Sequence, residues 1–199
     1  MDRAISSYKS THPNDTFSTT WKPFYLNPDA PKKGIDKEDY YRAKFGTERS
    51  SMMFQRLSSI GSSVGIDFKF GGKTGNTRDS HWLIQLGKKK SPEVQTRVVE
   101  ELFKAYFENE KDITDRDVLV SAAVKAGLEE KEASDWLDSV EDHGGKEVDE
   151  EVREAQDSMI NGVPNFTVQG HYEIGGAQDP EIFVKTFERI KRSENSSNA

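Results

Sequence analysis

The spacing of apolar residues changes twice along this chain, and this change limits the folds it can adopt. From residue 36 to about residue 161 apolar residues recur every three or four positions, which is typical of helices. Residues 16–26 and 166–174 instead favour strands, the second region as a hairpin. Helices are predicted for residues 2–10 and from Pro180 onward. The order predicts an α/β protein with a large helical insertion.

The composition and net charge of the chain exclude some classes of binding partner. The 199 residues carry a net charge of -7, so we expect no nucleic-acid partner and no binding to anionic membranes. No apolar run is long enough to span a bilayer. The polar N-terminal residues lack the apolar core of a secretory signal, which predicts a cytoplasmic protein. The acidic run 147–154 is predicted to be a solvated helix face.

The chain has no cysteine, which excludes disulfides, thiolate nucleophiles and thiol–disulfide exchange by these residues alone. The four histidines show no metal-ligand spacing, so no metal site is predicted.

Five short segments, each weakly specific alone, stand in a recognisable order. They are Trp21–Pro28, Gly75–Thr77 with Ser80–Ile84, Ala105–Glu108 with Ile113 and Ala126–Leu128, Gly162–Phe166, and Gly175–Gln178. In this order they resemble the DsbA-like thioredoxin family, in its FrnE-like branch. That family is related to the kappa-class glutathione transferases and the 2-hydroxychromene-2-carboxylate isomerases.

The resemblance implies a thioredoxin-like fold interrupted by helices. Residues 1–35 and 162–192 would form the thioredoxin-like domain, 36–161 the helical insertion, and 193–199 a disordered tail. Family members begin with a strand and a Cys-x-x-Cys, or a catalytic serine, at the first helix. Residues 1–5 align with a later part of that helix. We therefore expect a truncated N-terminus that lacks the usual first strand and contains no catalytic residue. Either the product is shortened or another segment fills the gap.

The resemblance also implies a binding groove at Val163 and Pro164. A cis bond before Pro164 would leave the Val163 backbone free to pair with an extended thiol peptide, glutathione or a small-molecule substrate. The alternative is a turn proline without a ligand. Asn76 would line the same groove, or else it would cap a helix on which His81 packs.

Ala177 and Gln178 complete the predicted site. They precede the last helix, and in relatives that use glutathione this region holds the γ-glutamyl carboxylate. The alternative is ordinary helix capping by Asp179.

The resemblance leaves three functions open. The first is a DsbA-like member of the thiol–disulfide oxidoreductase family without redox activity of its own. The second is a glutathione-dependent isomerase or transferase. The third is a non-catalytic binding module that uses the groove, with an open sheet edge that also allows a homodimer. The resemblance leaves open whether the chain is an enzyme, and glutathione is the one cofactor that it allows.

Overall fold

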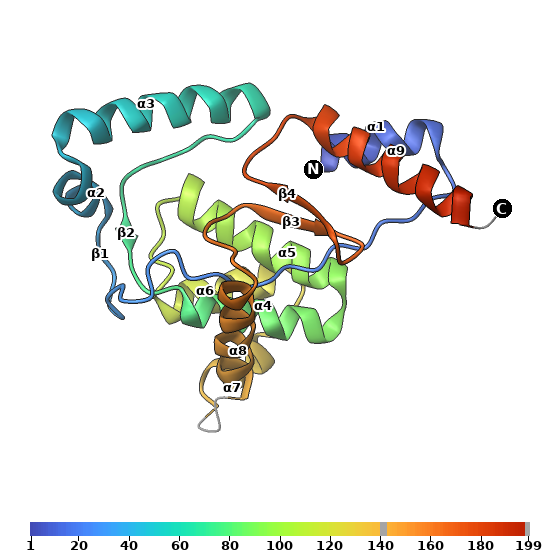
Figure 1. The fold of residues 1–199 in the computed structure, drawn as a ribbon. Helices are drawn as coiled ribbons and strands as arrows, with labels where there is room; N and C mark the ends of the chain where they lie inside the picture. Colours follow the sequence, from blue (N-terminus) through green and yellow to red (C-terminus); the bar gives the residue numbers. More distant parts are fainter. Residues whose placement is uncertain (140–142, 198–199) are drawn as a thin grey trace. The chain divides into compact units, whose positions relative to one another are not determined.

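The computed structural model describes residues 1–139 and 143–197, which form two compact units (Figure 1). The terminal unit comprises Met1–Ser18 with Ala155–Ala199, and the middle unit comprises Thr19–Glu154. None of the helices in the described ranges is long and apolar enough to cross a membrane.

The terminal unit packs two helices against a β-hairpin. Its elements are α1 (Asp2–Thr11), β3 (Asn165–Val168), β4 (Tyr172–Gly175) and α9 (Pro180–Ser197). Its apolar core consists of Ala4, Tyr8, Ile174, Phe183 and Phe187. The predicted first helix, hairpin and last helix are confirmed. Residues 193–197, which were expected in a disordered tail, continue α9.

A polar network in this unit ties the turn after α1 to α9. The Tyr8 hydroxyl donates a hydrogen bond to Asp15 (2.9 Å), and the Lys191 ammonium donates another (2.7 Å). Burial, with the nearby Asp15 carboxylate, raises the pKa of Tyr8 to about 12. The phenol therefore stays a donor to Asp15 over the whole physiological pH range.

The turn that joins β3 to β4 is tight, and its twist matches the twist of the two paired strands. Gln169 and Gly170 both have positive φ, 49° and 78°, and the His171 N–H donates to the Val168 carbonyl (3.3 Å). Positive φ at both central residues is the type I′ geometry, which favours Asn-Gly. A glutamine at the first position is therefore strained.

We expect Gln169→Asn to raise the free energy of unfolding by about 0.5–1 kcal/mol, because asparagine tolerates the left-handed region. Thermal and urea unfolding would measure the change. Gln169→Ala is the matched control, since it also removes the Gln169–Glu194 hydrogen bond but keeps the strain. Equal stability of the two variants would contradict the expectation.

The middle unit is mostly helical. Its helices are α2 (Lys37–Phe45), α3 (Thr47–Val64), α4 (Arg78–Lys90), α5 (Pro92–Phe103), the π-helix η1 (Lys104–Glu108), α6 (Arg116–Lys125), α7 (Glu130–Leu137) and most of α8 (His143–Asp157). Two short strands, β1 (Ile35–Asp36) and β2 (Lys73–Thr74), pair antiparallel. The predicted helical insertion is confirmed in outline.

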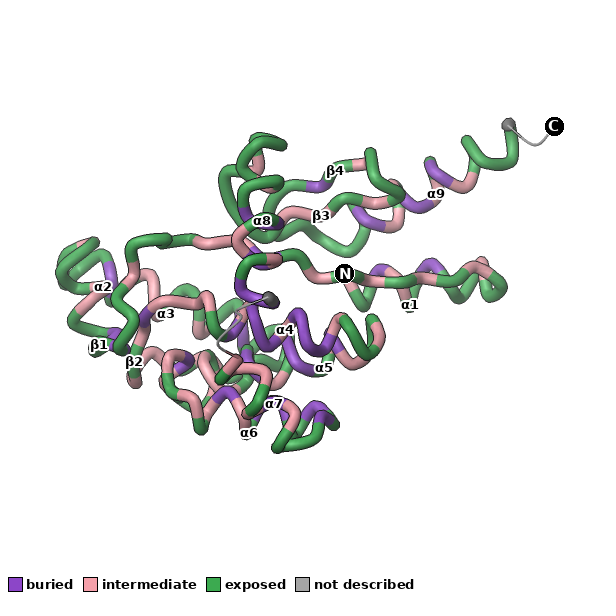
Figure 2. Tube along the Cα trace, turned by 90° about the horizontal axis from the view of Figure 1, so that it is seen from below, coloured by how far each residue is buried: buried purple, intermediate pink, exposed green. Residues whose placement is uncertain are grey.

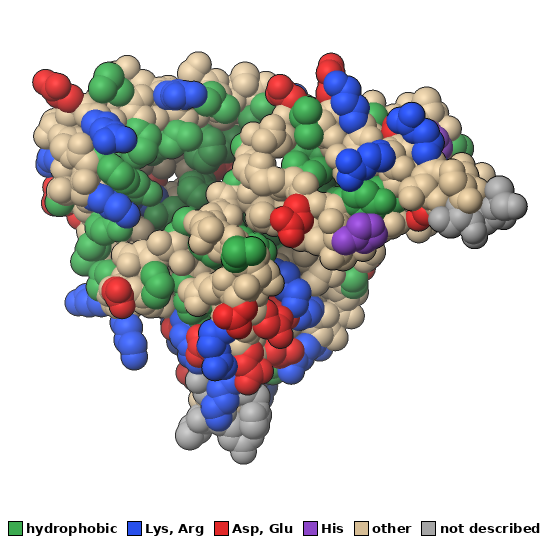
Figure 3. Space-filling model, viewed as in Figure 1, with side chains coloured by type: hydrophobic (Ala, Val, Ile, Leu, Met, Phe, Trp, Pro, Cys, Tyr) green, Lys and Arg blue, Asp and Glu red, His purple; other side chains and the backbone are tan. Residues whose placement is uncertain are grey.

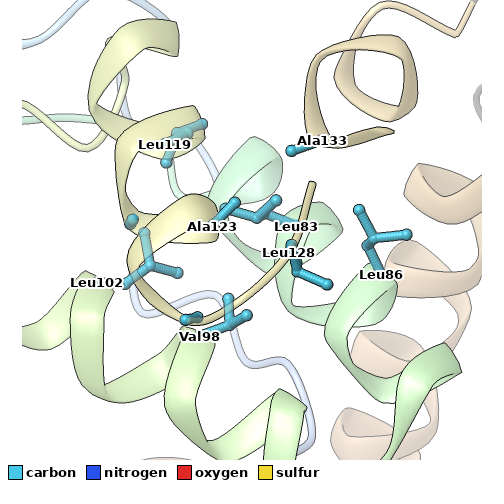
Figure 4. Packing of buried hydrophobic residues seen from close by; sticks show 10 residues of the cluster. Leu83, Leu86, Val98, Leu102, Leu119, Ala123, Leu128 and Ala133 are labelled. Carbon is cyan, nitrogen blue, oxygen red and sulfur yellow. The ribbon is translucent and has the colours of Figure 1, made fainter. Parts of the chain in front are cut away.

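The core of the middle unit lies among α4, α5, α6 and α7. Leu83, Leu86, Val98, Leu102 and Leu119 meet there, with small alanines from α6 and α7 (Figure 4). Buried residues are dense along α4 and α5, whereas α2 and α3 are mostly exposed or partly exposed (Figure 2).

Helix starts follow local capping chemistry. Ser91 accepts the Val94 N–H at the start of α5, as the Ser-Pro pair predicts. At α6 the cap is Asp115, which accepts from the Asp117 N–H. Thr114, one residue earlier, is also of a type that caps helices, but its hydroxyl donates to Asp112.

The strand predicted over residues 16–26 is absent, and this prediction is wrong. A strand needs a neighbour to take up its backbone hydrogen bonds. Here the buried Gln95 side chain takes that place at Trp21. The Trp21 N–H donates to Gln95 Oε1 (3.0 Å), and Gln95 Nε2 donates to the Trp21 carbonyl (2.9 Å).

Candidate functional site

The structure brings four of the five predicted site residues into the terminal unit. Val163 and Pro164 precede β3, whereas Ala177 and Gln178 lie between β4 and α9. The Val163–Pro164 peptide bond is cis. The Gly176 N–H donates to the Pro164 carbonyl (2.8 Å), which joins the two loops side by side. Asn76 belongs to the middle unit.

The bond between Gly176 and Pro164 also fixes which way the β3 backbone faces. In the antiparallel register Phe166 pairs with Ile174 and Val168 with Tyr172. Because backbone groups alternate along a strand, Phe166 and Val168 bond to β4, whereas Asn165 and Thr167 point their N–H and C=O groups away from it. Within the described ranges β4 is the only strand paired with β3.

Val163 lies two residues before the start of β3. Its residue surface is 47% exposed, and no hydrogen bond of its backbone N–H or C=O to another described residue is found. A free backbone donor and acceptor at such a position are suited to pairing with an extended peptide.

The turn before α9 is held by its own backbone contacts. Gln178 Nε2 donates to the Gly175 carbonyl (2.9 Å), and the Ile182 N–H donates to the Asp179 backbone carbonyl (3.0 Å). Ala177 and Gln178 are exposed. Their binding of a carboxylate stays a prediction.

Asn76 fixes a loop and the start of a helix. Its amide donates to the Ala30 carbonyl (3.3 Å), and its Oδ1 accepts from the Arg78 N–H at the start of α4 (2.8 Å). One turn later His81 Nδ1 contacts the Thr77 carbonyl (2.6 Å), and burial lowers the pKa of His81. These contacts explain both side chains as local supports, and the groove role of Asn76 stays a prediction.

Sequence reasoning missed a buried carboxylate in the middle unit. Glu151 accepts hydrogen bonds from Lys22 (2.7 Å), Lys88 (2.5 Å) and Gln85 (2.8 Å). Burial acts to raise the pKa of Glu151, but the three hydrogen bonds outweigh it, so this pKa lies below its ordinary value. The prediction of a solvated face over 147–154 is therefore wrong at Glu151.

A second carboxylate on α8 has a similar role. Asp149 accepts from the Tyr25 hydroxyl (2.8 Å) and from Arg78 Nε (3.1 Å). Acidic and basic side chains accordingly intermingle over α8 (Figure 3). Val148 and Val152 lie four positions apart on α8, and both are buried in the core. This apolar pair is the sequence feature that indicates that the adjacent Glu151 faces inward. These contacts hold residues 22–25 against α4 and α8.

Neither of two shallow cavities is lined by a predicted site residue. One, of about 510 Å³, lies between α2 and α3, and the other, of about 240 Å³, lies between Ser7 and the start of α9. No group of three or more acidic or histidine side chains in the described part of the chain is placed to hold a metal ion. The candidate site is thus a backbone edge rather than a pocket.

Comparison with solved structures supports the fold. A protein from Streptomyces coelicolor, assigned as a DsbA oxidoreductase, superposes with a TM-score of 0.84 at 24% identity, over 94% of this chain and 80% of its own. A protein from Nitrosomonas europaea, assigned as a protein disulfide isomerase, gives a TM-score of 0.67 at 13% identity, over 96% and 89% of the two chains. A search of curated protein sequences found no match.

The family model of the DSBA-like thioredoxin domain matches residues 1–188, which is nearly the whole chain. Together with the thioredoxin-like order of α1, the β3–β4 hairpin and α9 around a helical insertion, this match establishes the family. The chain belongs to the DsbA-like thioredoxin-domain family.

Proposed function

We propose that this chain is a polypeptide-binding member of the thiol–disulfide oxidoreductase family that performs no disulfide exchange by itself. The observation that carries the proposal is the exposed residue Val163 before the cis-proline, whose backbone N–H and C=O bond to no other described residue. An extended segment that contains a thiol or disulfide would pair there through main-chain hydrogen bonds. A cytoplasmic location and the FrnE-like branch remain parts of this proposal.

The absence of cysteine sets the chemical limit. Disulfide exchange requires a thiolate that attacks a disulfide sulfur and forms a mixed disulfide. None of the 199 residues carries a thiol. Both thiols must therefore come from outside these residues, which contribute binding and orientation.

A glutathione-dependent isomerase or transferase is the second candidate. The observation in its favour is the hydrogen bond that places the Gly176–Gln178 turn beside Pro164, so that a backbone-pairing site and a helix start are adjacent. Retention on immobilised glutathione, released by free glutathione, would favour this candidate.

Two assays test the proposed function. In an insulin-reduction assay with a thiol reductant, we expect the purified chain to give no acceleration over buffer. A fluorescent cysteine-containing peptide should bind wild type and Val163→Ala alike, because alanine keeps the backbone N–H. Val163→Pro removes that donor and should weaken binding at least five-fold. An N-methylated peptide, tested on the wild-type chain, repeats the experiment without a mutation.

Turnover above buffer in the insulin assay would overturn the redox part of the proposal. Equal affinity of Val163→Pro and Val163→Ala, together with equal affinity of the N-methylated peptide, would overturn the binding part. Circular dichroism of each variant checks that the fold is intact.

A further inference from the structure

Residues 35–74 form an arm that leaves the rest of the middle unit and returns to it through one pair of short strands. The strands β1 and β2 close the base of this arm, and α2 and α3 lie between them (Figure 1). All residues of the arm are described, and none of its hydrophobic side chains is buried. The core lies instead among α4, α5, α6 and α7. Segments with few buried apolar contacts open at a lower free-energy cost than the core.

The contacts that attach the arm gather on one short segment, η1 and the turn that follows it. The Lys69 N–H donates to the Phe107 carbonyl (2.7 Å), and the Gly71 N–H donates to Glu110 Oε1 (2.9 Å). The rings of Phe68 and Phe107 meet edge-on, with their centres 5.6 Å apart. η1 is a π-helix, a rare form that is frequent at functional sites. Attachment along a single segment allows the arm to move as one body about its base.

The backbone at the base of the arm is strained in the closed position. Glu110 has a φ of 53°, in the left-handed region that is unfavourable for a residue with a side chain. Gly72, with a φ of 77°, lies so close to Glu110 that a Cβ atom there would overlap the Glu110 carbonyl. Strained backbone persists only where its surroundings hold it, and it is common in switch regions. Separating Gly72 from Glu110 would allow this turn to relax.

A buried charge also disfavours the closed position. Lys37, the first residue of α2, is 3% exposed, and its ammonium lies 3.8 Å from the centre of the Tyr106 ring. The ammonium donates to the Tyr106 carbonyl (3.1 Å), but no carboxylate of the described residues forms an ion pair with it. Burial lowers the pKa of Lys37, and the more distant Glu110 carboxylate offsets this only in part. The charged form of Lys37 is therefore better accommodated in water than in the closed arm.

We infer that the arm is a lid that alternates between this closed position and an open position, in which its contacts with η1 and the following turn are broken. Opening uncovers the ring face of Tyr106 that Lys37 covers. It also separates Phe107 from Phe68. The freed rings then join Phe103, which is 49% exposed and lies beside Phe107, in one aromatic surface. The lid lies wholly in the middle unit and does not depend on the proposed function.

Hydrogen exchange of single backbone amides, measured by NMR on the full chain, distinguishes a swinging lid from a static arm. The Lys69 N–H is bonded to η1 and exchanges only when this contact opens. The Leu57 N–H lies inside α3 and remains bonded while the arm swings as one body. We expect the protection of Lys69 to be at least about ten-fold lower than that of Leu57. Protection of Lys69 equal to or above that of Leu57 would overturn the inference.

Two glycine variants test the base of the arm. Gly72→Ala forces a Cβ atom against the Glu110 carbonyl and should lower the protection of the Lys69 amide at least about five-fold. Gly65→Ala is the matched control, since Gly65 also has a positive φ (85°) but no heavy atom lies within 4 Å of its Cβ position. It should leave the protection of Lys69 within about two-fold of wild type. Equal effects of the two variants on Lys69 would contradict the lid.

Lys37→Met tests the buried charge. Methionine fills a similar space without an ammonium, so the closed position should be favoured and the Lys69 amide should become at least about three-fold better protected. Lys33→Met, at an exposed lysine, should leave this amide unchanged. Lower protection of Lys69 in Lys37→Met would show that the ammonium holds the arm closed, and would overturn its part in the inference.

Spin labels measure the movement itself, because the chain has no thiol of its own to react. Cysteines that replace the exposed Ser59 of α3 and Ser121 of α6 carry the labels. In Gly72→Ala we expect a second, longer distance between these labels that Gly65→Ala lacks. Labels at Glu93 and Ser121, both outside the arm, should give one distance in every variant. Circular dichroism checks that each variant is folded. One unchanged distance between Ser59 and Ser121 in Gly72→Ala would show that the arm does not swing.

Discussion

Replacing Gln95 with leucine is expected to lower the free energy of unfolding by about 3 kcal/mol, because it leaves two backbone groups of Trp21 without partners. Gln95 is 0% exposed, and its amide both donates to and accepts from the Trp21 backbone. An unsatisfied buried group costs about 1–3 kcal/mol. Urea unfolding followed by tryptophan fluorescence would measure the loss.

Gln55→Leu is the control for this substitution, since Gln55 is exposed on α3. It should change the free energy of unfolding by less than about 0.5 kcal/mol. If Gln95→Leu were as stable as Gln55→Leu, the hydrogen bonds of the Gln95 side chain would not be what fixes the segment around Trp21 in place.

The second large effect is expected at Glu151. Glu151→Gln replaces a carboxylate that accepts from two ammonium groups and an amide, and it should lower the free energy of unfolding by about 2 kcal/mol at pH 7. The figure is below that of a fully enclosed ion pair because Lys22 is 58% exposed and regains water. Urea unfolding would measure the change. Glu147→Gln, whose partner Lys89 is 3.8 Å away at the surface, should cost less than about 0.5 kcal/mol.

The effect at Glu151 depends on pH with a definite sign. The pKa of Glu151 is lower in the folded chain than its ordinary value, so the unfolded chain binds more protons between the two values. The stabilisation is full above the ordinary pKa of about 4.3 and is lost as pH falls through the folded-state pKa. Unfolding curves between pH 7 and pH 2 should show wild type and Glu151→Gln converging at the acid end. A constant difference would contradict this linkage.

Local patterns predicted the elements whose stabilising contacts lie nearby in sequence. The helices around Leu57, Val98 and Phe187 follow from apolar periodicity, and the hairpin follows from the alternation around Phe166. Thr114 shows the limit, because a side chain able to cap is drawn to Asp112 instead.

Contacts between residues that lie far apart in sequence could not be predicted from local patterns. Residues 16–26 do have a strand-like sequence. However, the group that takes up the backbone hydrogen bond of Trp21 is the Gln95 side chain, 74 positions away. Glu151 likewise meets Lys22 across 129 positions, so its burial left no local sign other than the two flanking valines.

The candidate site also has parts that local motifs predict and parts that only the structure shows. Val163, Pro164 and the Gly175–Gln178 turn were found through family motifs, and the structure adds the hydrogen bond between the two loops. Local sequence patterns do not determine the direction of the backbone groups of β3. Which β3 residues face outward depends on the register with β4, and a shift of one residue would exchange Asn165 with Phe166.

The central claim is that this DsbA-like domain binds an extended thiol-containing polypeptide through the Val163 backbone before the cis-proline. The most direct measurement is an amide NMR titration of the isotopically labelled chain with the cysteine-containing peptide. The account predicts that the Val163 amide shifts and exchanges more slowly with solvent once the peptide is bound. Saturable binding that leaves this amide unchanged would contradict it, as would the absence of any binding.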